Sequence, residues 1–211
     1  MTLAELIERP DARIDAIAAF LDDGDHAHRW REIGRLDRDH QRTLYEKAAA
    51  AAPLEVAYYI AGSSSTGTDR DEVIHDGVNT LPLPGGFRRF QKRFCRGAEP
   101  DEVFGYNEGP TRKVVGPGYF VGVLTEGRPE WEARGAVVID YYRAPDGAVS
   151  PGWPRVVPNT HGLQRFVYHQ TRDFMRRVSA HVSIGAAFKR ERPLDHYFVL
   201  CRRDEVVDSG R

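Results

Sequence analysis

The sequence predicts an α+β protein in which an N-terminal helical lobe packs on a curved antiparallel sheet, with a barrel as one form that the sheet can take. Three observations carry this prediction. Apolar residues recur with helical spacing before Pro53, the composition changes after it, and alternating apolar strands follow residue 116. We therefore expect a helical lobe at 1–52 and a β-rich domain at 53–211, with one continuous domain as the alternative.

Length and composition are those of a globular protein with a core of its own. The 211 residues are 41% hydrophobic and 29% charged. Cys95 and Cys201 are far apart and lack CxxC spacing, which predicts free thiols in a reducing compartment. The N-terminal residues are acidic without the apolar segment of a signal peptide, and no apolar run approaches the roughly 20 residues of a spanning helix. We expect a soluble, cytoplasmic protein that does not bind membranes.

The charge is divided unevenly along the chain. Residues 1–87 carry 9 Lys and Arg against 16 Asp and Glu, whereas residues 88–211 carry 21 against 15. Two interpretations stay open: the two parts attract each other within one fold, or the C-terminal part binds an anionic ligand or partner. A pI near 6.7 makes a dedicated nucleic-acid binder unlikely, because such domains usually have a pI above roughly 9.

Helices are predicted in three places in the N-terminal lobe. An apolar stripe begins at residue 3 and is broken by Pro10. Asp11 can cap a second helix, and Asp37 can cap a third that continues through an alanine run to Pro53. The acidic and histidine-containing tract at 22–28 reads as an exposed turn, with a metal site as the alternative.

Two segments follow before the β-rich half begins. VAYYIA at 56–61 is predicted to be a short strand that leads into GSSSTGTD at 62–69. This polar tract lacks the Gly-Lys-Ser/Thr ending of a phosphate-binding loop, so we interpret it as a linker.

The segment FRRFQKRFCR at 87–96 combines aromatic and basic residues. Phe87, Phe90 and Phe94 have helical spacing, and Arg88 belongs to the cationic positions between them. The pattern predicts a short helix with an aromatic face and a cationic face. Such a segment suits docking on the acidic lobe, binding of a small anion, or phosphate contact with base stacking on a nucleic acid.

Strands dominate from residue 116 onward. In 116–125, Tyr119 belongs to one of two apolar faces, which favours a central strand. The returning strand at 133–143 places Tyr141 on one face and Asp140 on the other. Burying Asp140 without a partner would be unfavourable by several kcal/mol, so it must be paired, edge-exposed or facing a cavity.

The next segments predict a loop, a covering helix and a hairpin. The proline-rich loop at 150–162 is long for a compact domain, and loops of this length are usually functional or mobile. Apolar spacing predicts a helix at 163–179, although its Phe-Val-Tyr run is also typical of a strand. After it, His181, Ser183 and Gly185 form a small polar face, which fits a strand that lines a cavity.

Among the candidate catalytic groups, His169 and Asp173 have the most defined spacing. Four residues apart on the predicted helix, they suit metal ligation or a histidine oriented by its carboxylate as a general base. A solvated surface pair is the competing interpretation. HxxxH, HExxH and CxxC spacings are absent from the sequence, so no metal site is predicted.

These observations lead to three hypotheses about function. The first is a small organic ligand, aromatic or anionic, in a pocket of the β-rich half. The second is an enzyme that uses His169, Asp173 and His181 for acid–base chemistry in that pocket. The third is a protein-interaction module that uses the basic segment 87–96. The sequence identifies neither a cofactor nor an oligomeric state. The residues expected to contact a ligand are Tyr119, Asp140, Tyr141, His161, Ser183 and Arg88.

Overall fold

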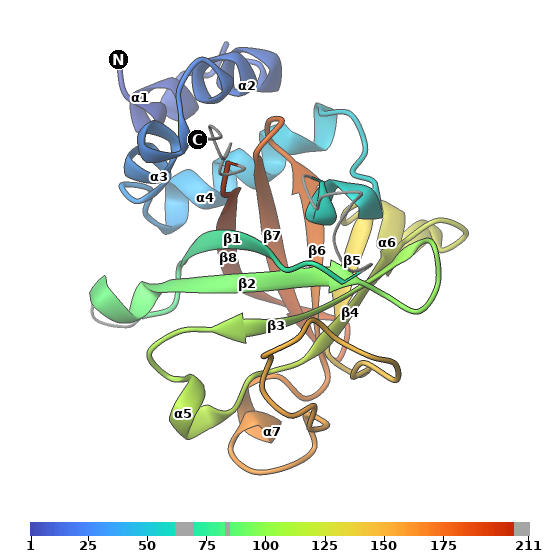
Figure 1. The fold of residues 1–211 in the computed structure, drawn as a ribbon. Coiled ribbons are helices and arrows are strands. Elements are labelled where there is room, and N and C mark those ends of the chain that lie inside the picture. Colours follow the sequence, from blue (N-terminus) through green and yellow to red (C-terminus); the bar gives the residue numbers. More distant parts are fainter. Residues whose placement is uncertain (62–69, 83–84, 205–211) are drawn as a thin grey trace, which may run out of the picture.

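A computed structural model describes residues 1–61, 70–82 and 85–204 and shows a helical N-terminal region beside a closed antiparallel barrel (Figure 1). The predicted fold class, a helical lobe on an antiparallel, barrel-like sheet, is confirmed. The predicted linker at 62–69 lies outside the described residues. None of the described helices combines the length and apolarity needed to cross a membrane.

The helical lobe contains one helix more than the sequence predicted. Asp37 caps a helix as expected, and Asp25 caps the unexpected one at the tract that we had interpreted as an exposed turn. The predicted cap at Asp11 is wrong: its carboxylate pairs with Arg9 and the helix begins later. The helices are α1 (Leu3–Glu8), α2 (Ile14–Asp22), α3 (His26–Ile33) and α4 (Arg38–Lys47), followed by the 3-10 turn η1 (Ala48–Ala50).

Eight strands form the barrel, each antiparallel to its neighbours in sequence, and β1 closes the sheet by pairing with β8. The strands are β1 (Val73–Asn79), β2 (Arg89–Arg96), β3 (Glu102–Glu108), β4 (Phe120–Leu124), β5 (Val137–Asp140), β6 (Thr171–Arg177), β7 (Val182–Lys189) and β8 (Arg192–Arg202). Short helical segments lie in the connections: η3 (Gly85–Arg88), α5 (Arg112–Val115), α6 (Pro129–Glu132) and α7 (Gln164–Val167).

The predicted helix at 87–96 is wrong, because residues 89–96 form β2 between β1 and β3. Phe90 and Phe94 differ by four positions, a spacing that fits one face of a strand as well as one face of a helix. Both rings point into the barrel, whereas Phe87 lies in η3 and is exposed. The spacing of Phe90 and Phe94 fits a helix and a strand equally, and the pairing of β2 with β1 and β3 makes this segment a strand.

The covering helix predicted at 163–179 is also shorter than expected. Only the single turn of α7 is helical, and the chain then enters β6 after Gln170, whose φ is 62°. The strand alternative for this segment is therefore right for 171–177. The strand predicted at 56–61 is instead the 3-10 helix η2 (Val56–Ile60), which buries the consecutive side chains of Tyr58, Tyr59 and Ile60. An alternating strand would have sent these side chains to opposite faces.

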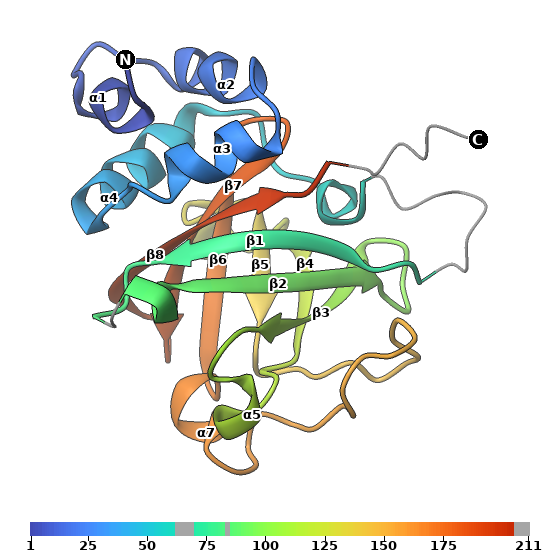
Figure 2. The same ribbon diagram turned by 60° about the vertical axis from the view of Figure 1, so that its left-hand side comes forward.

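Two cores result from this arrangement. Helices α3 and α4 lie on the outer face of the barrel at β7 and β8, and α1 and α2 pack on them (Figure 2). Val78, Ile184 and Val199 of this outer face belong to one core with leucines and isoleucines of the helices. The second core fills the space inside the barrel, called the lumen below. At the end where β1, β3, β5 and β7 begin, η2 packs against lumen residues. The opposite end carries α5 and α7 (Figures 1 and 2).

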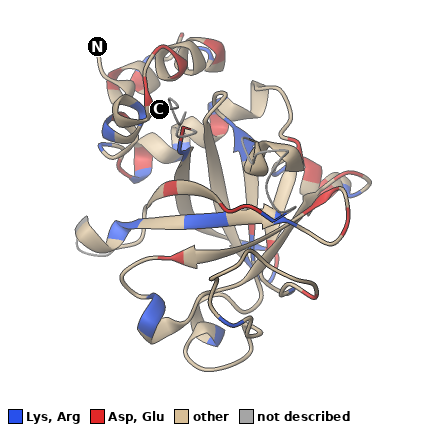
Figure 3. Cartoon of the chain, viewed as in Figure 1, with Lys and Arg blue, Asp and Glu red and all other residues tan. Residues whose placement is uncertain are grey.

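The acidic N-terminal part and the basic C-terminal part are not held together by ion pairs between lobe carboxylates and barrel cations among the described residues. Acidic side chains are spread over the helices, and Lys and Arg mark β2 (Figure 3). However, the ion pairs that join lobe and barrel within the described residues place the cation on the lobe, as in Arg29 with Asp204 and Arg42 with Asp195. The basic segment is therefore not docked through carboxylates of the lobe.

Candidate functional site

A lysine lies at the centre of the lumen. Strand alternation points Lys92 inward between Phe90 and Phe94, and its side chain is 2% exposed. Its Nζ donates to Asn107 Oδ1 at 3.0 Å, to Asp173 Oδ2 at 3.2 Å and to the hydroxyl oxygen of Tyr141. Lys92, Asn107, Tyr141 and Asp173 are called the lumen cluster below.

Aromatic rings enclose the ammonium group on several sides. Its nitrogen lies 4.8 Å from the ring centre of Phe198, 4.9 Å from Phe120 and 5.0 Å from Tyr141. Burial lowers the pKa of Lys92 and raises the pKa of Asp173, and the attraction between the two groups opposes both shifts. The lumen therefore favours neutral forms more than water does.

Tyr168 covers this cluster at the end that carries α7. Its ring stacks on Tyr141, with ring centres 5.3 Å apart and an angle of 19° between the planes. The ring also lies against Gly118, where a Cβ would come within 2.4 Å of it and where φ is +55°. Gly118 thus permits both the turn and the close approach of the ring.

A second polar group lies at the η2 end of the lumen. The His75 imidazole is fully buried, its Nε2 lies 3.1 Å from the carbonyl oxygen of Tyr59, and burial lowers its pKa to about 3. The hydroxyl groups of Tyr58 and Tyr59 approach that of Ser183, and burial raises the pKa of both tyrosines. Burial therefore favours the neutral forms of the imidazole and of the two phenols at this end.

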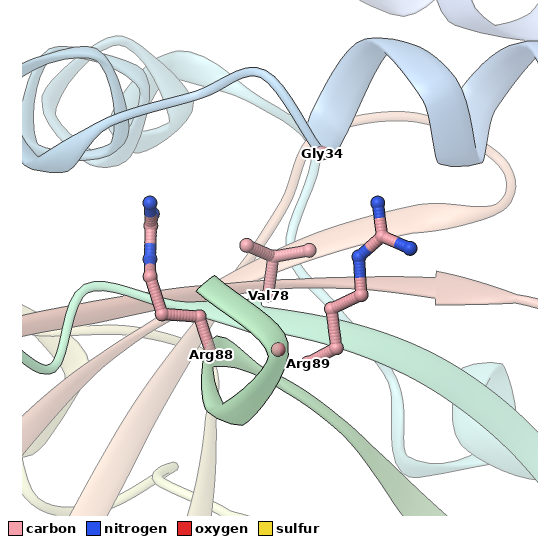
Figure 4. A pocket seen from close by; sticks show the side chains of 5 residues that line it. Gly34, Val78, Arg88 and Arg89 are labelled. Carbon is pink, nitrogen blue, oxygen red and sulfur yellow. The ribbon is translucent and has the colours of Figure 1, made fainter. Parts of the chain in front are cut away.

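Outside the barrel, a cavity of about 390 Å³ lies between the helical lobe and the start of β2 (Figure 4). It is called the inter-lobe pocket below, and its lining residues are Gly34, Val78, Gly86, Arg88 and Arg89. The side chains of Arg88 and Arg89 rise on either side of Val78 toward the lobe, so two guanidinium groups flank the opening.

Arg88 is held in place from both parts of the molecule. Its Nε donates to the Asn79 carbonyl oxygen at 2.8 Å and its Nη2 donates to that of Leu36 at 3.1 Å. The Arg89 guanidinium lies 5.3 Å from the ring centre of Trp30. Within residues 1–61, 70–82 and 85–204, neither arginine forms an ion pair with a carboxylate, so their positive charge faces the pocket uncompensated.

The ligand-contact residues predicted from the sequence fall into different environments. Tyr141 and Ser183 face the lumen, and Arg88 lines the inter-lobe pocket. Tyr119 lies outside the barrel, where its hydroxyl donates to the Pro154 carbonyl. Asp140 is paired with Arg172 at 3.3 Å, one of the three states that its position required.

The predicted catalytic residues are not brought together. The helical pairing of His169 with Asp173 is wrong, because Asp173 lies in β6 and points to Lys92, whereas His169 lies before the strand, near the ring of Tyr142. Nδ1 of His181 lies 3.4 Å from Oδ1 of Asp204, and His161 is exposed next to Thr160. No cluster of three or more potential metal ligands occurs in the described part of the chain.

Sequence reasoning missed Lys92 and Asn107 altogether. A lysine two residues from a phenylalanine on each side is the available signal, because those three side chains share one face of a strand. Reading 87–96 as a helix placed Lys92 on the cationic face instead.

No protein-family model, curated protein or solved structure matches this chain.

Proposed function

We propose that this protein binds a small organic anion, a carboxylate or phosphate joined to an aromatic group, in the inter-lobe pocket. The observation that carries the proposal is the pair of arginines, Arg88 and Arg89, which line a cavity without a carboxylate partner among the described residues. A positive charge that the protein leaves uncompensated beside a cavity favours an anion there.

The fixed position of Arg88 supports binding rather than a purely structural role. Two carbonyl groups, one from the lobe at Leu36 and one from β1 at Asn79, orient its guanidinium before any ligand arrives. Nη1 makes neither of these bonds, so it remains able to donate to an anion. An oriented guanidinium loses little conformational entropy on binding and can form strong charge-assisted hydrogen bonds.

The surroundings favour a ligand with an aromatic part. Trp30, whose ring centre lies 5.3 Å from the Arg89 guanidinium, is an aromatic side chain next to a residue that lines the pocket. A volume of about 390 Å³ lies in the range of sites for small organic molecules.

Isothermal titration calorimetry with phenyl phosphate at low salt tests the proposal. We expect saturable binding that Arg89→Ala weakens by about tenfold or more, since a lost charge-assisted hydrogen bond is worth about 1.5–3 kcal/mol. Arg96→Ala is the matched control, because Arg96 is exposed at the far end of the same strand. Equal weakening by both substitutions would show non-specific attraction and would contradict the proposal.

The interaction-module alternative uses the same two arginines and differs in the size of the partner. If acidic polypeptides such as polyglutamate bind while phenyl phosphate does not, the basic segment serves a macromolecule instead. The comparison therefore needs both probes, each titrated into the wild type and into Arg89→Ala.

A further inference from the structure

We infer that the lumen is a second site, in which Lys92 forms an imine with an aromatic aldehyde. The inference rests on the lumen cluster and is independent of the inter-lobe pocket. Lys92 is fully enclosed, and among the described residues Asp173 is its one carboxylate partner; the Asn107 amide, the Tyr141 hydroxyl and aromatic rings also surround it.

These surroundings raise the proportion of the uncharged, nucleophilic form of the amine above its proportion in water. The Nζ proton can pass to Asp173 Oδ2 across 3.2 Å, which leaves an uncharged amine beside an uncharged acid. Removing water makes this neutral pair more favourable relative to the ion pair, because two isolated charges are poorly solvated there. A desolvated lysine in an apolar site is a recognised nucleophile toward carbonyl groups.

The residues of the cluster supply each proton transfer that the reaction requires. Nζ attacks the carbonyl carbon, and the carbonyl oxygen takes a proton from Asp173. The nitrogen then returns a proton to the Asp173 carboxylate, which gives a neutral carbinolamine. Asp173 protonates the hydroxyl group, water leaves as the C=N bond forms, and the iminium proton returns to Asp173. The balance is aldehyde plus amine to imine plus water, without an oxidant or reductant.

The shape of the site selects an aromatic aldehyde. The ring of Tyr168 stacks on Tyr141 and also contacts Gly118. If this ring swings outward, a planar aromatic ring of similar size can stack on Tyr141 in its place. Nζ lies at the hydroxyl end of Tyr141, so a ring stacked there with its aldehyde group toward that end brings the carbonyl carbon toward Lys92.

The same end of the barrel has an apolar rim. Val114 on α5 and Leu163, Phe166 and Val167 on or beside α7 are exposed hydrophobic side chains. Each of α5 and α7 is a single helical turn, and Tyr168 directly follows α7. An apolar aldehyde can therefore reach the lumen by displacing one ring at a surface with exposed apolar side chains.

Reductive trapping tests the inference on the unmodified protein. The folded wild type is incubated with benzaldehyde and sodium cyanoborohydride at neutral pH, and peptide mass spectrometry locates the benzyl group. We expect the adduct on Lys92 to exceed that on Lys113, an exposed lysine, by several-fold. Modification of Lys113 without Lys92, in protein that retains its circular dichroism spectrum, would overturn the inference.

A variant at the covering ring tests the proposed route. Tyr168→Ala should increase the rate at which Lys92 is trapped by several-fold, whereas the rate at Lys113 should stay the same. An unchanged rate at Lys92 would contradict entry past Tyr168. Phenyl phosphate binding in the inter-lobe pocket should be unaffected by this variant, so the two sites can fail separately.

Discussion

The lumen and the inter-lobe pocket both contain cationic side chains, but they treat the charge in opposite ways. Lys92 has its carboxylate, Asp173, at 3.2 Å in a space enclosed by aromatic rings. Arg88 and Arg89 line an open cavity and have no carboxylate partner within the described residues. A charge that water cannot reach must be compensated by the protein itself, whereas a charge beside a cavity can be left for a ligand.

Removing the carboxylate of the lumen should have the largest effect. Asp173→Ala leaves Lys92 buried without its counter-charge, which we expect to lower the free energy of unfolding by about 3–5 kcal/mol. Arg89→Ala should change it by less than about 0.5 kcal/mol, since Arg89 is exposed. Urea unfolding measures both. Recovery of stability in the double variant Lys92→Met with Asp173→Leu would confirm that unpaired charge is the cause. Similar losses of stability in Asp173→Ala and Arg89→Ala would contradict the difference between the lumen and the inter-lobe pocket.

Acid should destabilise the protein through His75. Because burial lowers its pKa from 6.5 to about 3, the unfolded state takes up a proton between these values that the folded state does not. The contribution of His75 to the free energy of unfolding is complete above pH 6.5. It is lost as the pH falls toward 3, at about 1.4 kcal/mol per pH unit. Urea unfolding between pH 7 and pH 4 measures the slope. His75→Phe should reduce it and His161→Phe, at an exposed position, should not.

Within the inter-lobe pocket, the two arginines should separate stability from binding. Arg88→Ala removes the arginine donor from the carbonyls of Leu36 and Asn79, although the Leu36 carbonyl still accepts from Gln41 Nε2, and it should destabilise the protein by about 1–3 kcal/mol. Both Arg88→Ala and Arg89→Ala should weaken phenyl phosphate binding. Thermal unfolding and calorimetry on the same samples distinguish the two effects, and full binding by folded Arg88→Ala would remove Arg88 from the site.

The smallest expected effect concerns the aromatic part of the ligand. Trp30→Ala removes the ring whose centre lies 5.3 Å from the Arg89 guanidinium, which should weaken phenyl phosphate binding by about 0.5–1 kcal/mol. Binding of inorganic phosphate should change less, because it has no ring to stack. Equal changes for both anions would show that Trp30 only positions Arg89.

More of the fold than of the candidate sites could be predicted from the sequence. Alternation at 182–189 placed Ser183 and Gly185 on the inner face correctly, since a strand with one small face and one apolar face has few alternatives. The position of Lys92 inside the barrel could not be predicted, because Phe90 and Phe94 share a face in either a helix or a strand. The pairing of β2 with β1 and β3 decides that this segment is a strand. Such non-local pairing is not visible in a local pattern.

Asp173 and the inter-lobe pocket illustrate what a single sequence cannot provide. Asp173 and Lys92 are 81 positions apart, and their contact exists only after the barrel closes. Arg88 was a candidate for anion binding from its basic neighbours, but its orientation depends on carbonyl groups of Leu36 and Asn79, whose positions follow from the packing of the lobe on the barrel.

The most direct measurement of the proposed function is an NMR titration of the arginine Nε–Hε resonances with phenyl phosphate. We predict saturable shifts of Arg88 and Arg89 with one common dissociation constant, while Arg96 at the far end of β2 does not shift. Shifts of all exposed arginines in parallel, or a saturable response elsewhere with Arg88 and Arg89 unchanged, would contradict an anion site in the inter-lobe pocket.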